Sequence, residues 1–136
     1  MDAGTMLRNL ERATNDHDLA ALVDCFSSDY RNETPVHPAR SFRGREQVHA
    51  NWRRIFAAAP DLRARVLGSV VDGATVWSEW EMAGTRADGS AHLMRGVVIF
   101  EVADGRAASA RFYLEPVDHS VTDVNGAVQA AVGATS

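Results

Sequence analysis

Three Asp-Gly dipeptides, spaced sixteen residues apart, constrain the second half of this chain. They lie at 72–73, 88–89 and 104–105, each between segments of alternating apolar and polar residues. Asp-Gly supplies the positive φ that tight hairpin turns need, so this pattern is a strong signal for β-hairpins. The sequence therefore predicts a four-stranded antiparallel meander, with strands over residues 62–71, 75–85, 91–102 and 106–117.

In the first half of the chain, the apolar residues recur at a different spacing. Apolar side chains at i, i+3, i+4 and i+7 predict buried helical faces. They occur over residues 6–13, 19–26 and 45–59, and a proline directly follows the third stretch. We expect residues 29–35 to form a short edge strand. The nearby Pro35 and Pro38 have no backbone N–H to donate to a neighbouring strand.

Helices followed by a meander indicate an α+β fold in which the helices cover one face of the sheet. Strand alternation makes one face almost entirely apolar, and we expect that face to meet the helices. The outer face mixes charged groups with large apolar ones, which is too apolar for a surface exposed only to water. We expect it to form a two-fold homodimer interface. Its residues are Trp77, Glu79, Glu81, Arg95, Val97, Ile99, Arg111, Tyr113 and Glu115.

The charged and sulfur-bearing residues exclude several classes of function. The net charge is −4 and the 14 basic residues form no cluster, which argues against nucleic acid and anionic membranes as partners. All 14 are Arg, and a chain without Lys forms no Schiff base with a cofactor. Cys25 is the only cysteine and the five histidines lack paired metal-ligand spacing, so we expect no metal and no cofactor. No apolar run approaches the ~20 residues of a membrane span, and we expect a cytoplasmic location.

Several segments carry a family resemblance when they are taken in order. The break Asn15-Asp16-His17-Asp18-Leu19 separates the first two helices, Phe42-Arg43-Gly44-Arg45-Glu46-Gln47-Val48 opens the third, and Arg111-Phe112-Tyr113-Leu114-Glu115 ends the meander. With these pieces, residues 5–117 resemble the SnoaL-like domains of the nuclear transport factor 2-like superfamily. The resemblance implies a cone-shaped α+β fold in which N-terminal helices pack on a curved antiparallel sheet and enclose a pocket. Members commonly pair through the outer sheet face.

The resemblance leaves residues 118–136 as a C-terminal tail beside a single domain over residues 1–117. The tail is low in aromatic residues, yet Val121, Val124 and Val128 recur at helical spacing, followed by Val132. Two interpretations stay open, a frayed terminus and a short helix that packs over another surface.

The catalytic patterns of the superfamily's known enzymes are incomplete in this chain. Where ketosteroid isomerases have a Tyr and two Asp, the sequence has Leu10, Thr34 and Val98. Tyr30-Arg31-Asn32 resembles the water-holding Tyr-x-Asn of limonene-1,2-epoxide hydrolases, but the positions of their Arg and two Asp hold Trp80, Met82 and Phe112. The acid of aldol-type polyketide cyclases also falls on Phe112. The best-known mechanisms therefore do not transfer.

The residues expected inside the cone describe an apolar pocket with a few polar groups. Tyr30, Asn32 and Ser78 are the polar side chains able to orient a ligand. His37 lies in a loop that rims the pocket in this fold, so it is a candidate general base, with an exposed loop histidine as the alternative. For the apolar members, ordinary core packing is the alternative. They are Trp52, Trp80, Met82, Met94, Phe100 and Phe112.

Three functions fit these observations. The leading hypothesis is a domain that binds a small, largely apolar molecule. The second is an isomerase, cyclase or epoxide-hydrolase-like enzyme with a non-standard catalytic set, Tyr30, Asn32 and His37. The third is a non-catalytic dimerisation or structural module with a filled core. A cavity of a few hundred Å³ favours the first two, and a packed interior favours the third.

Overall fold

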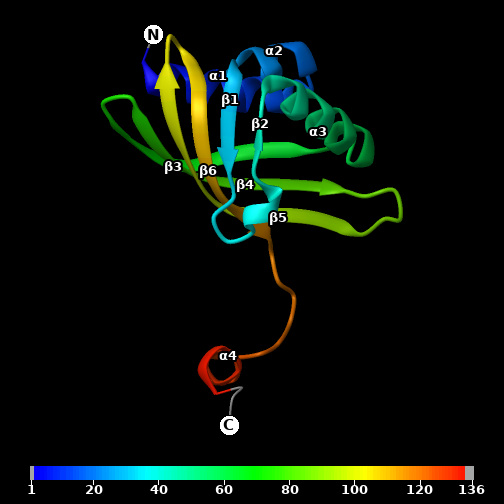
Figure 1. Cartoon of the computed structure of the whole chain (residues 1–136). Helices are drawn as coiled ribbons and strands as arrows, with labels where there is room; N and C mark the ends of the chain where they lie inside the picture. Colours follow the sequence, from blue (N-terminus) through cyan, green and yellow to red (C-terminus); the bar gives the residue numbers. More distant parts are fainter. Residues whose placement is uncertain (1, 134–136) are drawn as a thin grey trace.

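A computed structural model describes residues 2–133 and shows helices packed on one face of a curved six-stranded sheet (Figure 1). The strand order is β2-β1-β6-β5-β4-β3. The predicted α+β fold is confirmed. The helical elements are α1 (Ala3–Asn15), α2 (Leu19–Asp24), the short 3₁₀ turn η1 (Pro38–Arg40), α3 (Arg45–Ala58) and α4 (Val124–Val132). The strands are β1 (Phe26–Glu33), β2 (Phe42–Arg43), β3 (Arg63–Asp72), β4 (Thr75–Thr85), β5 (Ala91–Ala103) and β6 (Arg106–Pro116).

The three Asp-Gly dipeptides lie at the three predicted hairpin turns, and β3 to β6 form the predicted antiparallel meander. At the last turn both Asp104 (φ 53°) and Gly105 (φ 76°) have positive φ. A two-residue type I′ turn needs this conformation at both central positions. Local backbone preference therefore explains where each hairpin of the meander reverses.

The predictions for residues 19–35 were wrong in two respects. Phe26 starts β1 instead of ending the second helix, because the Ala107 amide donates to the Cys25 carbonyl (2.8 Å) and draws the chain into the sheet. β1 is also not an edge strand: it lies between β2 and β6 and runs parallel to β6. The two prolines that suggested an edge follow the end of β1, so they leave its ladder intact.

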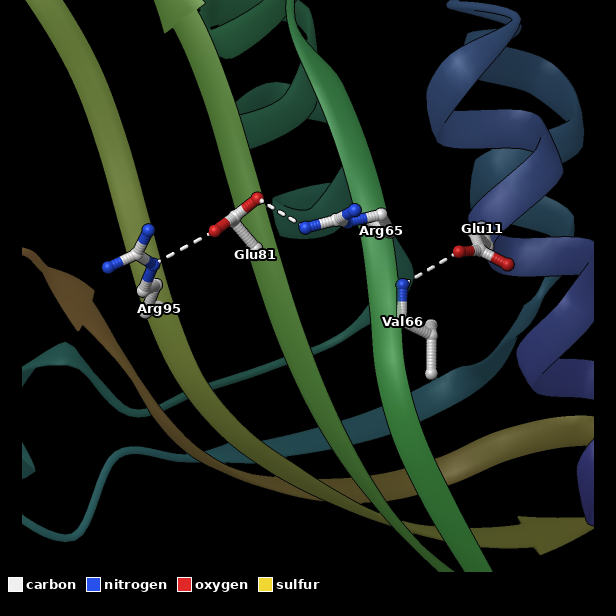
Figure 2. Close-up of polar contacts among 5 residues, drawn as sticks. All are labelled: Glu11, Arg65, Val66, Glu81 and Arg95. Atoms are coloured by element: carbon white, nitrogen blue, oxygen red, sulfur yellow. Dashed lines mark hydrogen bonds and ion pairs between the residues drawn. The ribbon is translucent and has the colours of Figure 1, made fainter.

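Helix α1 covers the first half of the edge strand β3. The Asn15 side chain makes the two hydrogen bonds that a neighbouring strand would make. Its Nδ2 donates to the Ala64 backbone carbonyl (2.9 Å), and its Oδ1 accepts from the Ala64 backbone N–H (2.7 Å). One turn earlier, Glu11 accepts a hydrogen bond from the Val66 amide (2.7 Å; Figure 2). These contacts satisfy backbone groups that an open edge would expose to pairing with another chain. The register then shifts between Val66 and Gly68.

The outer face of the sheet has the cross-strand neighbours that alternation predicts. Trp77 pairs with Ile99, and Ile99 with Arg111, across β4, β5 and β6. Trp77 is 50% exposed, but Ile99 is only 4% exposed in the single chain. Ile99 therefore belongs to the packing of one chain and is not free to contact a second copy.

The outer face also carries a row of ion pairs. The Glu81 carboxylate contacts Arg65 (3.2 Å) on β3 and Arg95 (2.9 Å) on β5, as Figure 2 shows. The hydrogen bond from Arg95 lowers the pKa of Glu81 below its usual value, so this carboxylate stays charged at neutral pH.

Residues 124–132 of the C-terminal tail form the short helix α4, but it does not pack over another surface within the described residues. α4 lies apart from the sheet and the other helices at the end of an extended linker (Figure 1). Residues 134–136 of the predicted tail lie outside the described residues. No helix in residues 2–133 combines the length and apolarity that crossing a membrane requires.

The Asn15 contact predicts a specific loss of stability. Replacing Asn15 by Ala leaves the Ala64 amide and carbonyl without their partner, so the free energy of unfolding should fall by about 1–3 kcal/mol. Urea denaturation monitored by circular dichroism measures this change. Asn9→Ala on the same helix is the matched control, because Asn9 makes no side-chain hydrogen bond within the part of the chain that is described. Equal losses in the two variants would contradict this role for Asn15.

Candidate functional site

A cavity of ≈ 370 Å³ lies between α3, β1 and β2 on one side and the far ends of β4, β5 and β6 on the other. Most of its lining is apolar, with aromatic side chains from β1, β2, α3 and β6. The α3 side chains reach it because Val48, Trp52 and Ile55 recur at helical spacing on the face turned to the sheet. A cavity of this size and lining is typical of sites for small organic molecules.

Three polar side chains of β1 form a hydrogen-bonded ladder along one wall of the cavity. Tyr30, Asn32 and Thr34 alternate in sequence, so they share one face of the strand. The Tyr30 hydroxyl donates to Asn32 Oδ1 (2.8 Å), and Asn32 Nδ2 donates to Thr34 Oγ1 (3.2 Å). All three side chains are buried, the most exposed being Thr34 at 9%.

The direction of this ladder decides what it can offer a ligand. The Tyr30 proton is used within the ladder, and burial raises the pKa of Tyr30 far above its usual value. Tyr30 is therefore not a base. Asn32 keeps a second N–H and Thr34 keeps its O–H, and both groups are donors beside the cavity. The ladder thus suits an acceptor oxygen on a ligand.

The mouth of the cavity carries a small charged cluster. The Glu115 carboxylate lies 3.1 Å from His37 Nε2 and 3.7 Å from Arg40 Nη1. Across the mouth, desolvation and the neighbouring Arg86 lower the pKa of His92, so its ring is neutral at neutral pH. Charge is thus confined to the rim and does not extend to the ladder.

Glu115 pairs with Arg95 on the outer face, as alternation predicts, and its carboxylate also contacts His37 at the mouth of the cavity. Glu33 on β1 pairs with Arg111 on β6 in a parallel register. Four residues further along each chain, the loop after β1 brings His37 beside Glu115. Sequence alternation alone misses this contact because it depends on the parallel pairing of two distant segments.

The predicted site residues separate into three groups. Tyr30 and Asn32 line the cavity together with four of the apolar residues, which are Trp52, Met82, Met94 and Phe112. Trp80 and Phe100 lie deeper, around a void of only ≈ 20 Å³. Ser78 lines neither space, since its hydroxyl accepts from Trp80 Nε1 (2.9 Å) and donates to the Val98 carbonyl (2.7 Å).

The proposed catalytic set Tyr30, Asn32 and His37 is not brought together. The His37 ring faces Glu115 at the rim and is absent from the cavity lining. Sequence reasoning missed Thr34 and Glu115 as site residues. The alternation of β1 could have revealed Thr34, which follows Tyr30 and Asn32 on the same face.

Two other clefts, of ≈ 490 and ≈ 580 Å³, lie at the opposite end of β6 and have many charged side chains in their lining. Cys25 borders the first, and burial raises the pKa of its thiol to about 11, which leaves it protonated and unreactive at neutral pH. No cluster of His, Cys, Asp and Glu within residues 2–133 is arranged to hold a metal ion. We therefore regard the apolar cavity as the candidate functional site.

Comparison with known proteins supports the fold. IdmH from Streptomyces antibioticus, a candidate polyketide cyclase, is 22% identical with a TM-score of 0.73, over 84% of this chain and 92% of that chain. AclR from Streptomyces galilaeus, a candidate hydroxylase, is 15% identical with a TM-score of 0.72, over 83% and 78%. A protein from Catenulispora acidiphila with a ketosteroid isomerase-like fold, solved with trimethylamine, is 16% identical with a TM-score of 0.69, over 88% of each chain. These similarities show the fold alone.

The sequence comparisons are consistent with these structures. No curated protein matches this sequence. The family model described as the SnoaL-like domain matches residues 7–110, which is most of the chain. The chain therefore belongs to the SnoaL-like domain family.

Proposed function

We propose that this protein binds a small, largely apolar molecule with one hydrogen-bond-accepting oxygen in the cavity beneath α3. The observation that carries the proposal is the buried ladder of Tyr30, Asn32 and Thr34 along the wall of an apolar cavity. Unused donors in such a setting favour a ligand that supplies an acceptor. Ketones, esters, ethers and epoxides all provide such an oxygen.

The rest of the lining limits the ligand's charge and affinity. An ionised group deep in the cavity would lose its hydration without meeting an opposite charge, because charged side chains lie only at the mouth. Burying ~200 Å² of apolar ligand surface contributes about 5 kcal/mol before the cost of association. One or two hydrogen bonds add little more, so we expect affinities in the micromolar range.

The enzyme alternative has weaker support. The ionisable side chains near the cavity all lie at its mouth, and they are His37, Arg40, His92 and Glu115. Through the parallel register, Glu115 lies three residues beyond the row of Thr34, about 10 Å along the sheet. A base at that distance does not reach a carbon adjacent to an oxygen that the ladder holds. We therefore favour ligand binding over catalysis as the function of this cavity.

We also propose that two copies associate through the outer sheet face. Trp77 is half exposed and Tyr113 is 38% exposed, and both lie on this face among charged side chains. A two-fold contact would pair the patch with itself, which lets carboxylates of one copy meet arginines of the other.

The ligand proposal predicts that Asn32 discriminates between two matched probes. 2-Acetylnaphthalene has a ketone oxygen, and 2-ethylnaphthalene has nearly the same shape without it. Asn32→Leu should weaken binding of the ketone about fivefold to tenfold and leave the hydrocarbon unchanged, since one hydrogen bond contributes about 1 kcal/mol. Binding is followed by fluorescence of Trp52, which lines the cavity.

Gln47→Leu is the matched control for this experiment. Gln47 is an exposed amide side chain of α3 that does not line the cavity. Thermal unfolding shows whether each variant remains folded at the assay temperature. Equal affinity of the wild-type protein for both probes, or no binding of either, would refute the proposal.

The dimer proposal predicts that Trp77→Asp produces a monomer at micromolar concentration. The substitution places an unpaired carboxylate in the contact and removes its largest exposed apolar side chain. Light scattering coupled to gel filtration measures the mass. Val36→Asp is the control, because Val36 is also exposed but lies in the loop after β1. A wild-type monomer under these conditions would contradict the proposal, and Ile99→Asp is unsuitable because Ile99 is already buried.

A further inference from the structure

The C-terminal helix α4 has an apolar stripe that the described fold leaves uncovered. Its sequence, VNGAVQAAV, contains no charged residue. Val124 is 72% exposed and Val132 is 74% exposed. The helix is nevertheless capped, because Asp123 accepts a hydrogen bond from the Gly126 amide (2.9 Å). An uncharged helix with such a stripe is stabilised when the stripe packs against another apolar surface. The stripe consists of Val124, Ala127, Val128, Ala131 and Val132.

The linker to α4 starts at the mouth of the cavity. Glu115 lines the mouth, and β6 ends one residue later at Pro116. Residues 117–123 can span up to about 23 Å when extended, and a helix of nine residues is about 14 Å long. The linker is therefore long enough to bring α4 back to the mouth at which the linker starts.

The two sides of the sheet next to this point differ in what they offer α4. On the outer face, the row nearest the linker is the ion-paired Arg65, Glu81 and Arg95 (Figure 2). Charged groups also lie at the cavity mouth, so the position of the nearest apolar side chains distinguishes the two sides. On the outer face the first apolar side chain is Tyr113, one row further from the linker than Leu114. On the inner side, the cavity presents Met94 and Leu114 near the end of β6. The apolar stripe therefore matches the cavity side.

We propose that α4 folds back over its own chain and forms the outer wall of the cavity, with the valine stripe facing inward. In this arrangement Val128, near the middle of the stripe, contacts the ligand and helps to exclude water. The part concerning the ligand rests on the proposed function, whereas the position of α4 does not.

Disulfide cross-linking of the full chain tests the position of α4. Cys25 is the only cysteine, so the introduced cysteines are the only thiols in a Cys25→Ala background. Val128→Cys is combined with His92→Cys or with Arg40→Cys, which are both cavity-lining positions at the mouth. Ala130→Cys, on the opposite side of α4, is the matched control for each pair. Mild oxidation without ligand is followed by intact mass and by non-reducing electrophoresis.

We expect an intramolecular disulfide from Val128→Cys with at least one mouth position, formed at least tenfold faster than from Ala130→Cys. The rate should not depend on protein concentration. Cross-linked dimers as the main product would show that α4 packs on a second copy and would overturn the proposal. Equal rates for Val128→Cys and Ala130→Cys would also overturn it, because they would show that no face of α4 is preferred.

A second measurement tests the contribution of α4 to ligand binding. Val128→Asp should speed dissociation of 2-acetylnaphthalene about tenfold, while Ala130→Asp should leave the rate unchanged, as measured by stopped-flow fluorescence. Equal rates in the two variants, together with specific intramolecular cross-linking, would limit α4 to covering the cavity without contacting the ligand. Specific cross-linking without any binding of the ketone would refute the proposed function and leave the position of α4 supported.

Discussion

The parallel pairing of β1 with β6 is the contact on which the rest of the structure depends. It joins the N-terminal half of the chain to the meander, starting where the Ala107 amide donates to the Cys25 carbonyl. Without it, β1 would have no hydrogen-bonded neighbour except the two-residue strand β2. Parallel pairing requires a long connection between the strands, and here that connection contains α3 and the first three strands of the meander. The same connection therefore supplies both α3 and the opposite wall of the cavity.

This pairing also organises the candidate site into two chemically different regions. Along β1 it buries the ladder of Tyr30, Asn32 and Thr34 against apolar side chains, where hydrogen bonds are protected from water. Beyond the end of β1 it brings His37 beside Glu115, where both side chains keep about a third of their surface exposed. Solvent screens charges at the rim, whereas a charge beside the ladder would be costly. This separation is the reason for proposing a neutral ligand although ionisable groups line the mouth of the cavity.

The same fold protects itself against unwanted strand pairing. The meander leaves β3 as an edge strand, and an edge strand presents free amide and carbonyl groups. Asn15 and Glu11 of α1 satisfy such groups at Ala64 and Val66, so one helix both covers the core and closes half of the edge. On the outer face, the ion pairs of Glu81 keep one end of the sheet polar. The exposed apolar side chains of this face include Trp77, its neighbour Val70 on β3 and Tyr113.

The sequence by itself determined the features that depend on neighbouring residues. Asp-Gly dipeptides placed the three hairpin turns, and alternation assigned Met82 and Phe112 to the inner face, because turn conformation and strand pleat are local properties. Only the tertiary structure decided the parallel neighbour of β1, the contact of Glu115 with His37 and the hydrogen bond from the Ser78 hydroxyl to the Val98 carbonyl. It also decided that Ile99 is buried although it lies on the outer face. Each of these depends on strands or side chains that meet only after the chain has folded, and a local pattern does not encode which of them will be neighbours.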